Sequence, residues 1–445
     1  MPIHPHFRQR RAGVLMHLTS LPDGGRSLAT AKQFVDWLAN AGFTWWQMLP
    51  VGPPGPGNSP YSSPSAFAGD ANLLADAELD GNFQAFLNDE AYWLQDWVGW
   101  SCRMAAENAG VAGEGEEGGG TRFVTDPMTV AQQQFRFQLA WQELRNYANK
   151  RGIHLLGDIP IFVELGSADV AAHPDLFRLN ADGTPEVVTG VPPDCFSDTG
   201  QLWGHPHYNW PAHREQNFEW WLQRLQRQLR LFDAVRIDHF IGFHNAWEVD
   251  GDAETAMHGH WALAPGAEIL TAMQQQYPQG LPLLAEDLGE VTPPVIDLRD
   301  RFELPGMRIL QNAFYAAESA DLPQNCPPNS VTYTGTHDNQ TWQGWQSELQ
   351  EQAVASTDFE EAAQTLARLR LYLQGHETPL DLAFSSGSNL VVVPMQDILG
   401  LGADARMNTP ATTEGNWQWQ VHANALSDDL AAKLRAQIQQ ADRLR

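Results

Sequence analysis

Eight short apolar segments rich in β-forming residues constrain the fold of this 445-residue chain more than any other feature of its sequence. Stretches with helical periodicity separate most of them, and such alternation is typical of parallel β/α units. Eight is the number of strands that closes a β/α barrel. The segments are Val14–Leu18, Thr44–Leu49, Ile153–Leu156, Ala234–Ile237, Leu281–Ala285, Met307–Asn312, Val331–Thr334 and Leu390–Val393. We therefore expect an α/β fold in which residues 1–445 form a single (β/α)8 TIM barrel.

Seven stretches of the chain have helical periodicity, and we expect the first two to cover the barrel. In the first of them, Phe34, Trp37 and Leu38 lie on one helical face, which we expect to pack against the strands. The predicted helices are Ala29–Ala41, Thr129–Lys150, Glu219–Leu231, Ala267–Gln275, Thr292–Phe302, Asp358–Leu373 and Ser427–Arg443.

Two connections are too long for ordinary barrel loops. Residues 51–128 join the second and third strands, and residues 163–211 follow the third strand in a stretch rich in proline, glycine, aspartate and aromatic residues. Active sites of β/α barrels lie at the carboxyl ends of the strands, where such loops emerge. We therefore expect both insertions to form subdomains over the mouth of one catalytic barrel.

The charge balance and the cysteine spacing exclude several classes of partner. Lys and Arg total 27 against 54 Asp and Glu, and the formal charge of −27 repels nucleic acid and anionic lipid. No apolar run approaches the roughly 20 residues of a membrane span, so we expect a cytoplasmic protein that binds neither membrane nor nucleic acid. Cys102, Cys195 and Cys326 lack the spacing of a zinc site or a disulfide framework. We expect no metal and no cofactor.

Charged side chains follow four of the predicted strands. They are Asp158 after the third strand, Arg236 and Asp238 at the fourth, Glu286 after the fifth, and His337 with Asp338 after the seventh. A single carboxylate at a strand end often caps a helix or pairs with an arginine. Convergence of several from different strands at one barrel mouth indicates a catalytic site instead.

Two of these acids have the environments that double displacement at an acetal carbon requires. Asp238 lies two residues after Arg236, so strand alternation places both side chains on one face, where the guanidinium favours an ionised, nucleophilic aspartate. Glu286 follows apolar and small residues, and burial there raises its pKa so that it keeps a proton to donate. Asp338, beside His337, is suited to binding sugar hydroxyls.

Ten ordered motifs give the chain a clear family resemblance over nearly its whole length. They are "HLTSLP" (17–22), "WWQMLPVGP" (45–53), "NSPYSSPSAFAG" (58–69), "GDIPIFV" (157–163), "GVPPDCFSDTGQLWGHPHYNW" (190–210), "VRIDHF" (235–240), "AEDLG" (285–289), "LPGMRILQ" (304–311), "YTGTHDN" (333–339) and "ARMNTP" (405–410). The chain resembles the amylomaltases, bacterial 4-alpha-glucanotransferases of the alpha-amylase clan.

The resemblance implies a role for each motif residue. Asp238 matches the family nucleophile, Glu286 the general acid/base and Asp338 the transition-state stabiliser, with Arg236 and His337 as substrate-site partners. Further positions that resemble glucan-binding residues of the family are Ser59, Tyr61, Asp158, Asp194, Gln201, Trp203 and Asn408. Amylomaltases also lack the separate C-terminal β domain of amylases.

Three residues depart from the family pattern outside the catalytic trio. Cys195 stands where tyrosine is usual, His205 where asparagine is usual, and Ile241 where arginine is usual. These departures bear on chain-length preference and acceptor choice.

The function that we expect is transfer of alpha-1,4-glucan segments from a maltooligosaccharide donor to the 4-hydroxyl of glucose or of another glucan, with retention. An alpha-glucan hydrolase with the same carboxylates is the alternative, and the sequence does not measure the ratio of transfer to hydrolysis. A catalytically silent glucan-binding protein and a metal-dependent sugar isomerase are further alternatives; turnover of glucan excludes the first, and activity that resists chelators excludes the second.

Overall fold

The computed structural model describes residues 2–109, 124–193, 197–355, 359–376, 378–412 and 414–444. Its centre is a sheet of eight parallel strands in the order β10-β11-β12-β1-β2-β3-β6-β9. The strands are β1 (Arg11–Leu15), β2 (Trp45–Gln47), β3 (His154–Ile159), β6 (Ala234–Ile237), β9 (Leu283–Ala285), β10 (Gly306–Ile309), β11 (Ser330–Tyr333) and β12 (Leu390–Pro394). Ala285 N–H donates to Pro305 O across 2.9 Å, which links the two ends of the sheet. The predicted (β/α)8 barrel is confirmed.

All eight strands lie where the sequence predicts them, although their ends differ. The largest shift is in β1, which runs over Arg11–Leu15 rather than Val14–Leu18. Its pairing with β12 begins at Arg11↔Leu390 and its pairing with β2 ends at Leu15↔Gln47. Leu18–Ser20 instead form a turn of 3-10 helix at the barrel mouth. The apolar pattern therefore located the strand, whereas its ends depend on the neighbouring strands.

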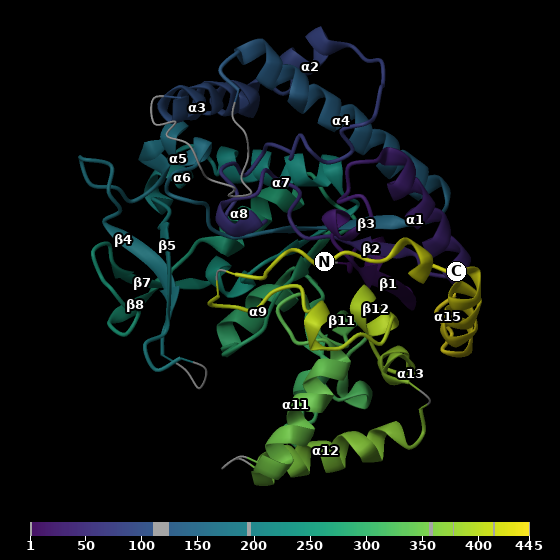
Figure 1. Cartoon of the computed structure of the whole chain (residues 1–445). Helices are drawn as coiled ribbons and strands as arrows, with labels where there is room; N and C mark the ends of the chain where they lie inside the picture. The colour runs from purple at the N-terminus through teal and green to yellow at the C-terminus, as the bar shows by residue number, and fades with distance from the viewer. Residues whose placement is uncertain are drawn as a thin grey trace.

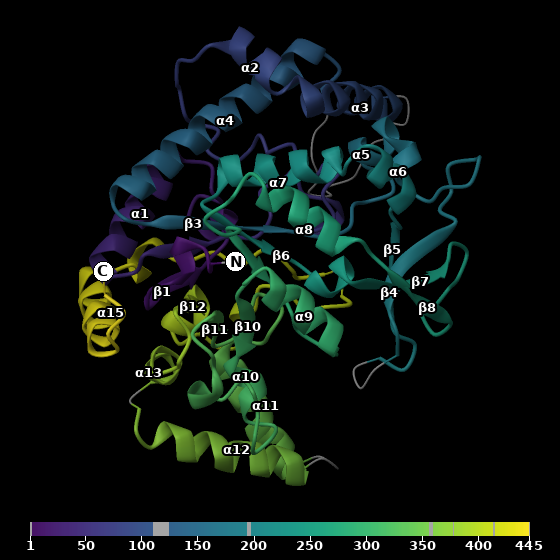
Figure 2. The same cartoon turned by 180° about the vertical axis from the view of Figure 1, so that it is seen from behind.

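The seven predicted helices are also confirmed. Most of them surround the barrel, whereas the one predicted at Asp358–Leu373 lies farther from the strands (Figure 1 and, from behind, Figure 2). They are α1 (Leu28–Ala41), α4 (Pro127–Lys150), α7 (Glu219–Leu231), α8 (Gly266–Gln274), α9 (Pro293–Arg301), α12 (Phe359–Leu373) and α15 (Asp428–Gln440). Side chains of Ser27 and Asp126 cap the first turns of α1 and α4 by accepting main-chain N–H bonds. The sequence analysis missed α2 (Phe83–Asp89), α3 (Ala91–Ala109), α5 (Ala168–Ala172), α6 (Trp210–Glu215), α10 (Leu310–Ala313), α11 (Trp342–Ala355), α13 (Pro379–Phe384) and α14 (Met395–Ile398).

Strand alternation divides the core into two layers. Alternate residues such as Leu15, Trp45 and Tyr333 fill the interior of the barrel. Their neighbours face outward, and Trp46 packs edge to face on Phe34 of α1 with ring centroids 4.8 Å apart. Such packing on both faces makes the strand ends rigid supports for the side chains that follow them.

Two groups of elements extend beyond the barrel. Helices α2, α3 and α4 lie above it in Figure 1, and a four-stranded antiparallel sheet in the order β5-β4-β7-β8 lies at its side. That sheet was not predicted, and its strands are β4 (Val187–Val191), β5 (Gln201–Pro206), β7 (Asn245–Asp250) and β8 (Gly259–Leu263). Two of them follow β6, so this lobe draws on residues outside 163–211. The division into a barrel with subdomains over 51–128 and 163–211 stays a prediction.

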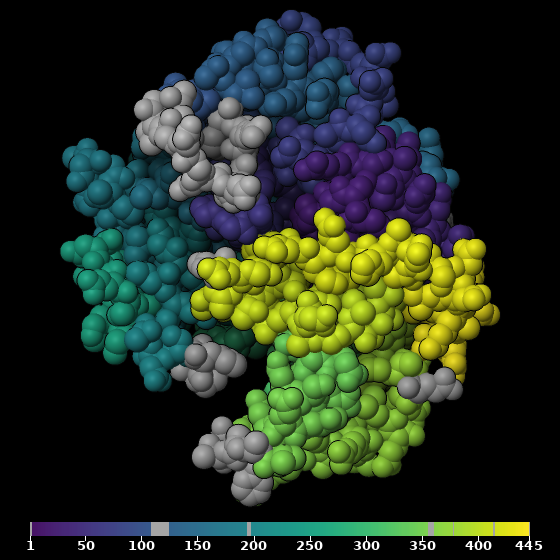
Figure 3. Space-filling view, in the orientation of Figure 1, coloured from purple at the N-terminus to yellow at the C-terminus, as the bar shows by residue number. Residues whose placement is uncertain are grey.

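The end of the chain returns to the barrel. After β12, the described residues form helices and irregular segments without a further strand. In Figure 3 the C-terminal part, in yellow, lies against the N-terminal part, in purple. Val421 N–H donates to Ser20 O across 2.8 Å, which fixes this contact at the mouth. Among the residues that the structure describes, no helix has the length and apolar character needed to cross a bilayer.

Candidate active site

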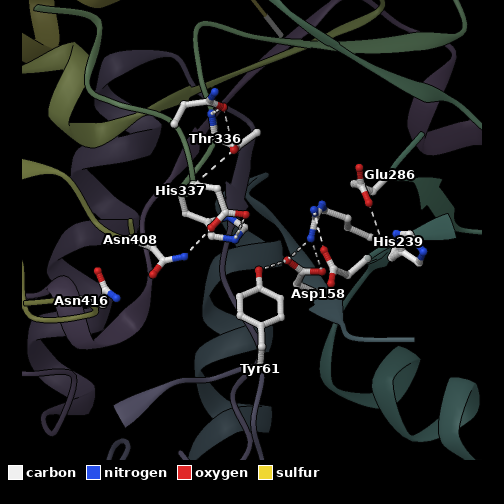
Figure 4. A network of polar contacts seen from close by, with 12 residues as sticks. Tyr61, Asp158, His239, Glu286, Thr336, His337, Asn408 and Asn416 are labelled. Carbon is white, nitrogen blue, oxygen red and sulfur yellow. Dashed lines mark hydrogen bonds and ion pairs between the residues drawn. The ribbon is translucent and has the colours of Figure 1, made fainter. Parts of the chain in front are cut away.

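Side chains of the catalytic candidates gather at the carboxyl ends of the barrel strands (Figure 4). Strands β6 and β9 are paired neighbours, and their register places Ile237 opposite Ala285. Asp238 and Glu286 are the next residues of the two strands. Glu286 N–H donates to Ile237 O across 3.1 Å, so the two acids leave adjacent strands at the same level. Strand pairing therefore brings together two carboxylates that lie 48 positions apart in the chain.

Arg236 joins two carboxylates at the end of β6. Its Nη1 lies 2.9 and 2.7 Å from the two carboxylate oxygens of Asp158, which is its register partner on β3. Its Nη2 lies 2.8 Å from Oδ1 of Asp238, so the two β6 side chains share a face as their spacing predicts. Arg236 and Asp158 are buried, whereas 29% of the Asp238 side chain is exposed. Burial raises the pKa of Asp158 to about 6, against the opposing charge of Arg236. The arrangement leaves Asp238 as the accessible member of the cluster.

Tyr61 reaches this cluster from the proline-rich loop after β2. Its hydroxyl donates to Asp158 Oδ2 across 2.8 Å. Its ring stacks on that of His337, with centroids 5.2 Å apart and an interplanar angle of 15°. Ser59 lies one turn earlier, and its Oγ accepts the N–H of Tyr61 across 3.3 Å. Ser59 thus helps to fix the loop, and Tyr61 contacts both Asp158 and His337.

Glu286 is buried, and main-chain groups hold both of its carboxyl oxygens. Oε2 accepts the N–H of His239 across 2.6 Å, and Oε1 accepts the N–H of Leu288 across 3.0 Å. Burial raises the pKa of Glu286 to about 7, the charge of Arg236 opposes this rise, and the charge of Asp238 adds to it. A carboxyl group of this pKa can both donate and accept a proton near neutral pH.

His239 adopts a conformation that few residues other than glycine take. Its φ of 51° and ψ of 52° lie in the left-handed region, which costs of order 1 kcal/mol for a residue with a Cβ. This backbone turn points the N–H of His239 at Glu286 immediately after Asp238. The ring of His239 meets Trp203 edge to face, with centroids 4.8 Å apart. The strained backbone of His239 therefore connects Asp238, which precedes it in the chain, with Glu286, which accepts its N–H.

Asp338 lies on the other side of the mouth, after β11. Its Oδ2 is 3.3 Å from Nε2 of His337, and its Oδ1 accepts from Asn408 Nδ2 across 2.6 Å. Burial acts to raise the pKa of Asp338, yet the charge and hydrogen bond of His337, the amide of Asn408 and the charge of Arg236 hold it well below its usual range. The pKa of His337 is raised in turn by Asp338, although burial opposes the rise. Asp338 is therefore a carboxylate throughout the neutral range.

The remaining predicted binding residues have different positions. Trp203 on β5 joins the small sheet to the site through its contact with His239. Gln201, at the start of β5, accepts from Trp203 Nε1 across 3.4 Å and has no described contact with the carboxylates. Asp194 and Cys195 lie outside the described residues. His205 is one of the three residues that depart from the family pattern, and its Nε2 lies 3.5 Å from Oε1 of Glu164.

Two neighbours of the site were not singled out in the sequence. Trp417 packs on Tyr61 and His337, with centroid distances of 5.8 and 6.0 Å. Arg406 donates from Nη2 to the main-chain oxygen of Asp338 across 2.6 Å. Arg406 stands in the quoted "ARMNTP" motif two residues before Asn408, so the motif contained the information; Trp417 had no comparable pattern. Among the described residues, no cluster of three or more His, Cys, Asp or Glu side chains is arranged to hold a metal ion.

The chemistry of this site is that of glycosidic bond exchange. A barrel mouth presents an accessible carboxylate paired with arginine, a buried carboxyl of pKa about 7 on the adjacent strand, and an ionised third acid. Such a set can attack an acetal carbon, protonate the departing oxygen and stabilise positive charge on the sugar ring. The fold and the site together are those of a (β/α)8-barrel enzyme that acts on glycosidic bonds.

Comparisons with known proteins name the family within that class. The sequence matches the 4-alpha-glucanotransferase family over residues 16–88 and 121–426. The 4-alpha-glucanotransferases of Thermus thermophilus and Aquifex aeolicus are each 36% identical to it, over 98% and 93% of this chain and 99% and 95% of theirs. The chain belongs to the 4-alpha-glucanotransferase family, and it is an enzyme that transfers segments of alpha-1,4-glucan.

Solved structures agree with this assignment. The amylomaltase from Streptococcus agalactiae in complex with acarbose is 30% identical and superposes with a TM-score of 0.85, covering 98% of this chain and 100% of that one. The amylomaltase from Corynebacterium glutamicum, at 16% identity, shares the fold with a TM-score of 0.76 over 98% of this chain and 75% of its own.

Proposed function

We propose that Asp238 is the nucleophile, Glu286 the general acid/base and Asp338 the transition-state stabiliser of a retaining transfer between alpha-1,4-glucans. The single observation that carries this proposal is the pairing of β6 with β9, which sets Asp238 and Glu286 side by side. The contact of Arg236 with Asp238 and the raised pKa of Glu286 support the division of roles.

In the first half of the reaction, a carboxylate oxygen of Asp238 attacks C1 of the donor sugar. The bond between C1 and the glycosidic oxygen breaks, and the proton of Glu286 passes to that oxygen, so the shortened glucan leaves with a free 4-hydroxyl. Asp338 stabilises the positive charge that develops on the ring, because it remains ionised. The result is a glucosyl ester on Asp238 and an ionised Glu286.

In the second half, an acceptor 4-hydroxyl takes the place of the departed glucan. Glu286 accepts the hydroxyl proton, the acceptor oxygen bonds to C1, and the ester bond to Asp238 breaks. Two inversions at C1 retain the alpha configuration. Burial of Glu286 together with its two main-chain hydrogen bonds supports this alternation, since burial favours the protonated form and the N–H groups favour the ionised form.

We also propose the binding roles that the geometry supports. Arg236 and Asp158 hold Asp238 and bind sugar hydroxyls on one side, and His337 with Asn408 does so on the other. Tyr61 and Trp203 offer aromatic surface to the sugar rings. The binding roles proposed for Ser59, Asp194 and Gln201 rest on the family resemblance alone. Maltooligosaccharides are the donors. The acceptors are glucose and other glucans. We expect the enzyme to act in the cytoplasm.

Incubation with maltotriose tests the proposal directly. Transfer yields glucose together with a ladder of glucans longer than maltotriose, which high-resolution chromatography separates. A final mixture of glucose and maltose without longer products would instead establish an alpha-glucan hydrolase with the same carboxylates. Binding of maltotriose without any product would establish a silent glucan-binding protein.

A further inference from the structure

The loop that carries His337 and Asp338 packs through the buried ring of His337 on Tyr61 and Trp417, and another part of it borders a pocket. A pocket lies at this part of the mouth, and Thr336, His337, Asn339 and Thr341 form one of its walls. Arg406 is among the residues on its other walls. The side chain of Asp338 is itself 43% exposed, so packing alone does not fix it and hydrogen bonds contribute to its position.

Arg406 supplies two of those hydrogen bonds, both to main-chain oxygens. Its Nη2 lies 2.6 Å from Asp338 O, and its Nε lies 2.8 Å from Asn408 O. No carboxylate of a described residue forms an ion pair with it. The planar guanidinium is rigid, so donation from two of its nitrogens fixes the separation of the two carbonyl groups.

Asn408 completes the link between the two segments. Its N–H donates to His337 O across 3.1 Å, and its side-chain amide donates to Asp338 Oδ1 across 2.6 Å. The segment around Arg406 is itself anchored, because Trp417 N–H donates to Met407 O across 2.8 Å. Asn408 thus holds the carboxylate of Asp338, while Arg406 holds the backbone from which that carboxylate projects and the backbone of Asn408 itself.

We propose that Arg406 is a positioning residue for the transfer reaction, which sets the carboxylate of Asp338 against the reacting sugar without contacting the sugar. This inference rests on the proposed stabilising role of Asp338. A displacement of about 1 Å in such a group costs roughly 100-fold in rate. Arg406 therefore acts on the chemical step more than on substrate affinity.

The test compares Arg406→Met and Arg406→Lys with a matched control, Arg435→Met. Arg435 also donates to two main-chain oxygens, Ala39 O and Asn40 O, at the contact between α15 and α1. Arg406→Met is expected to lower kcat for maltotriose roughly 10- to 100-fold with KM changed less than about threefold. Arg406→Lys, whose ammonium can still reach one carbonyl, is expected to recover part of the loss. Arg435→Met is expected to keep full kcat.

Two further measurements separate positioning from a general loss of structure. The Tm of Arg406→Met and the alkaline limb of its pH–rate profile are expected to match the parent enzyme, because Arg406 does not contact Glu286. In a double-mutant cycle with Asn408→Ala, the two losses in kcat are expected to be strongly non-additive, since both substitutions release the same carboxylate. Additive losses would overturn the inference.

The stabilising role proposed for Asp338 is tested separately from the positioning role of Arg406. If Asp338→Asn abolishes transfer while Arg406→Met keeps full kcat, Arg406 has no positioning role and the proposed function stands. If Asp338→Asn keeps full kcat, the stabilising role fails, and the inference about Arg406 fails with it. If Arg406→Met does not fold, Arg406→Lys replaces it in the test. A folded Arg406→Lys variant with lowered kcat and unchanged KM would support the inference.

Discussion

The two sides of the barrel mouth place acids in opposite protonation states. Glu286, after β9, is buried against main-chain N–H groups, and burial raises its pKa to about 7. Asp338, after β11, has His337 and Asn408 as side-chain partners, which hold its pKa well below its usual range although burial acts in the other direction. Glu286 is buried, whereas 43% of the Asp338 side chain is exposed, and the two acids also have different partners. For Asp338, His337 and Asn408 outweigh burial and the acid stays charged. For Glu286, burial and the charge of Asp238 outweigh Arg236 and the two main-chain N–H groups, so the acid can keep its proton near neutral pH.

Asp238 lies between the two sides, and its removal should have the largest effect. Asp238→Ala is expected to lower kcat by roughly four orders of magnitude or more, because no covalent intermediate forms. Folding is expected to persist, since 29% of this side chain is exposed and it leaves no core cavity. Turnover of maltotriose and the Tm are the measurements. Asp250→Ala, at the exposed end of β7, is the matched control and should keep full activity. Substantial residual transfer would remove Asp238 from the nucleophile role.

Glu286→Gln probes the protonated side of the comparison. The loss of proton donation is expected to reduce kcat by roughly 10²- to 10⁴-fold, with a smaller loss for an alpha-maltosyl fluoride donor, whose leaving group needs no proton. A general acid must start protonated, so parent activity should fall as pH rises through about 7, the pKa of Glu286. That alkaline limb should vanish in the variant.

The control for this change is Glu290→Gln, an exposed residue of the same loop. Its pH–rate profile should overlay that of the parent enzyme. An alkaline limb that survives in Glu286→Gln would assign the proton donor to another group.

Asp338→Asn probes the charged side. Loss of a fixed negative charge from the developing oxocarbenium ion is expected to lower kcat by roughly 10²- to 10³-fold. The alkaline limb near pH 7 should remain, because Glu286 is unaffected. Single-turnover kinetics with maltotriose measure the chemical step, and a change confined to KM would show that Asp338 only binds substrate.

Trp203→Ala should have the smallest effect of the four. Its ring meets His239 beside the site, and removal of an aromatic contact worth about 1 kcal/mol should lower the ratio of transfer to hydrolysis roughly threefold to tenfold. Glucose release and glucan lengthening, measured together, give the ratio. Trp261→Ala is the control, since its described ring contact is with Trp247 on the small sheet. An equal effect of both substitutions would point to the lobe's stability rather than to acceptor binding.

The sequence alone determined the barrel and the sides of the mouth from which the acids come. The number of strands and the helical faces depend on local periodicity, which burial on one face imposes on each segment. The small sheet escaped this reasoning because β5 contains glycine and proline, which usually interrupt a strand. Pairing of β4 with β7, which are 53 residues or more apart, replaces that missing local signal.

Tertiary structure alone decided how the acids differ. No local pattern places the hydroxyl of Tyr61 on Asp158, 97 residues away, or the guanidinium of Arg406 on the backbone of Asp338, 68 residues away. The sequence around His239 also does not predict the left-handed backbone that directs its N–H to Glu286. A pKa depends on every charge and dipole within a few ångströms, and those neighbours come from distant parts of the chain. Periodicity can therefore locate the acids at the ends of strands, whereas the neighbours of each acid in the folded chain set its pKa.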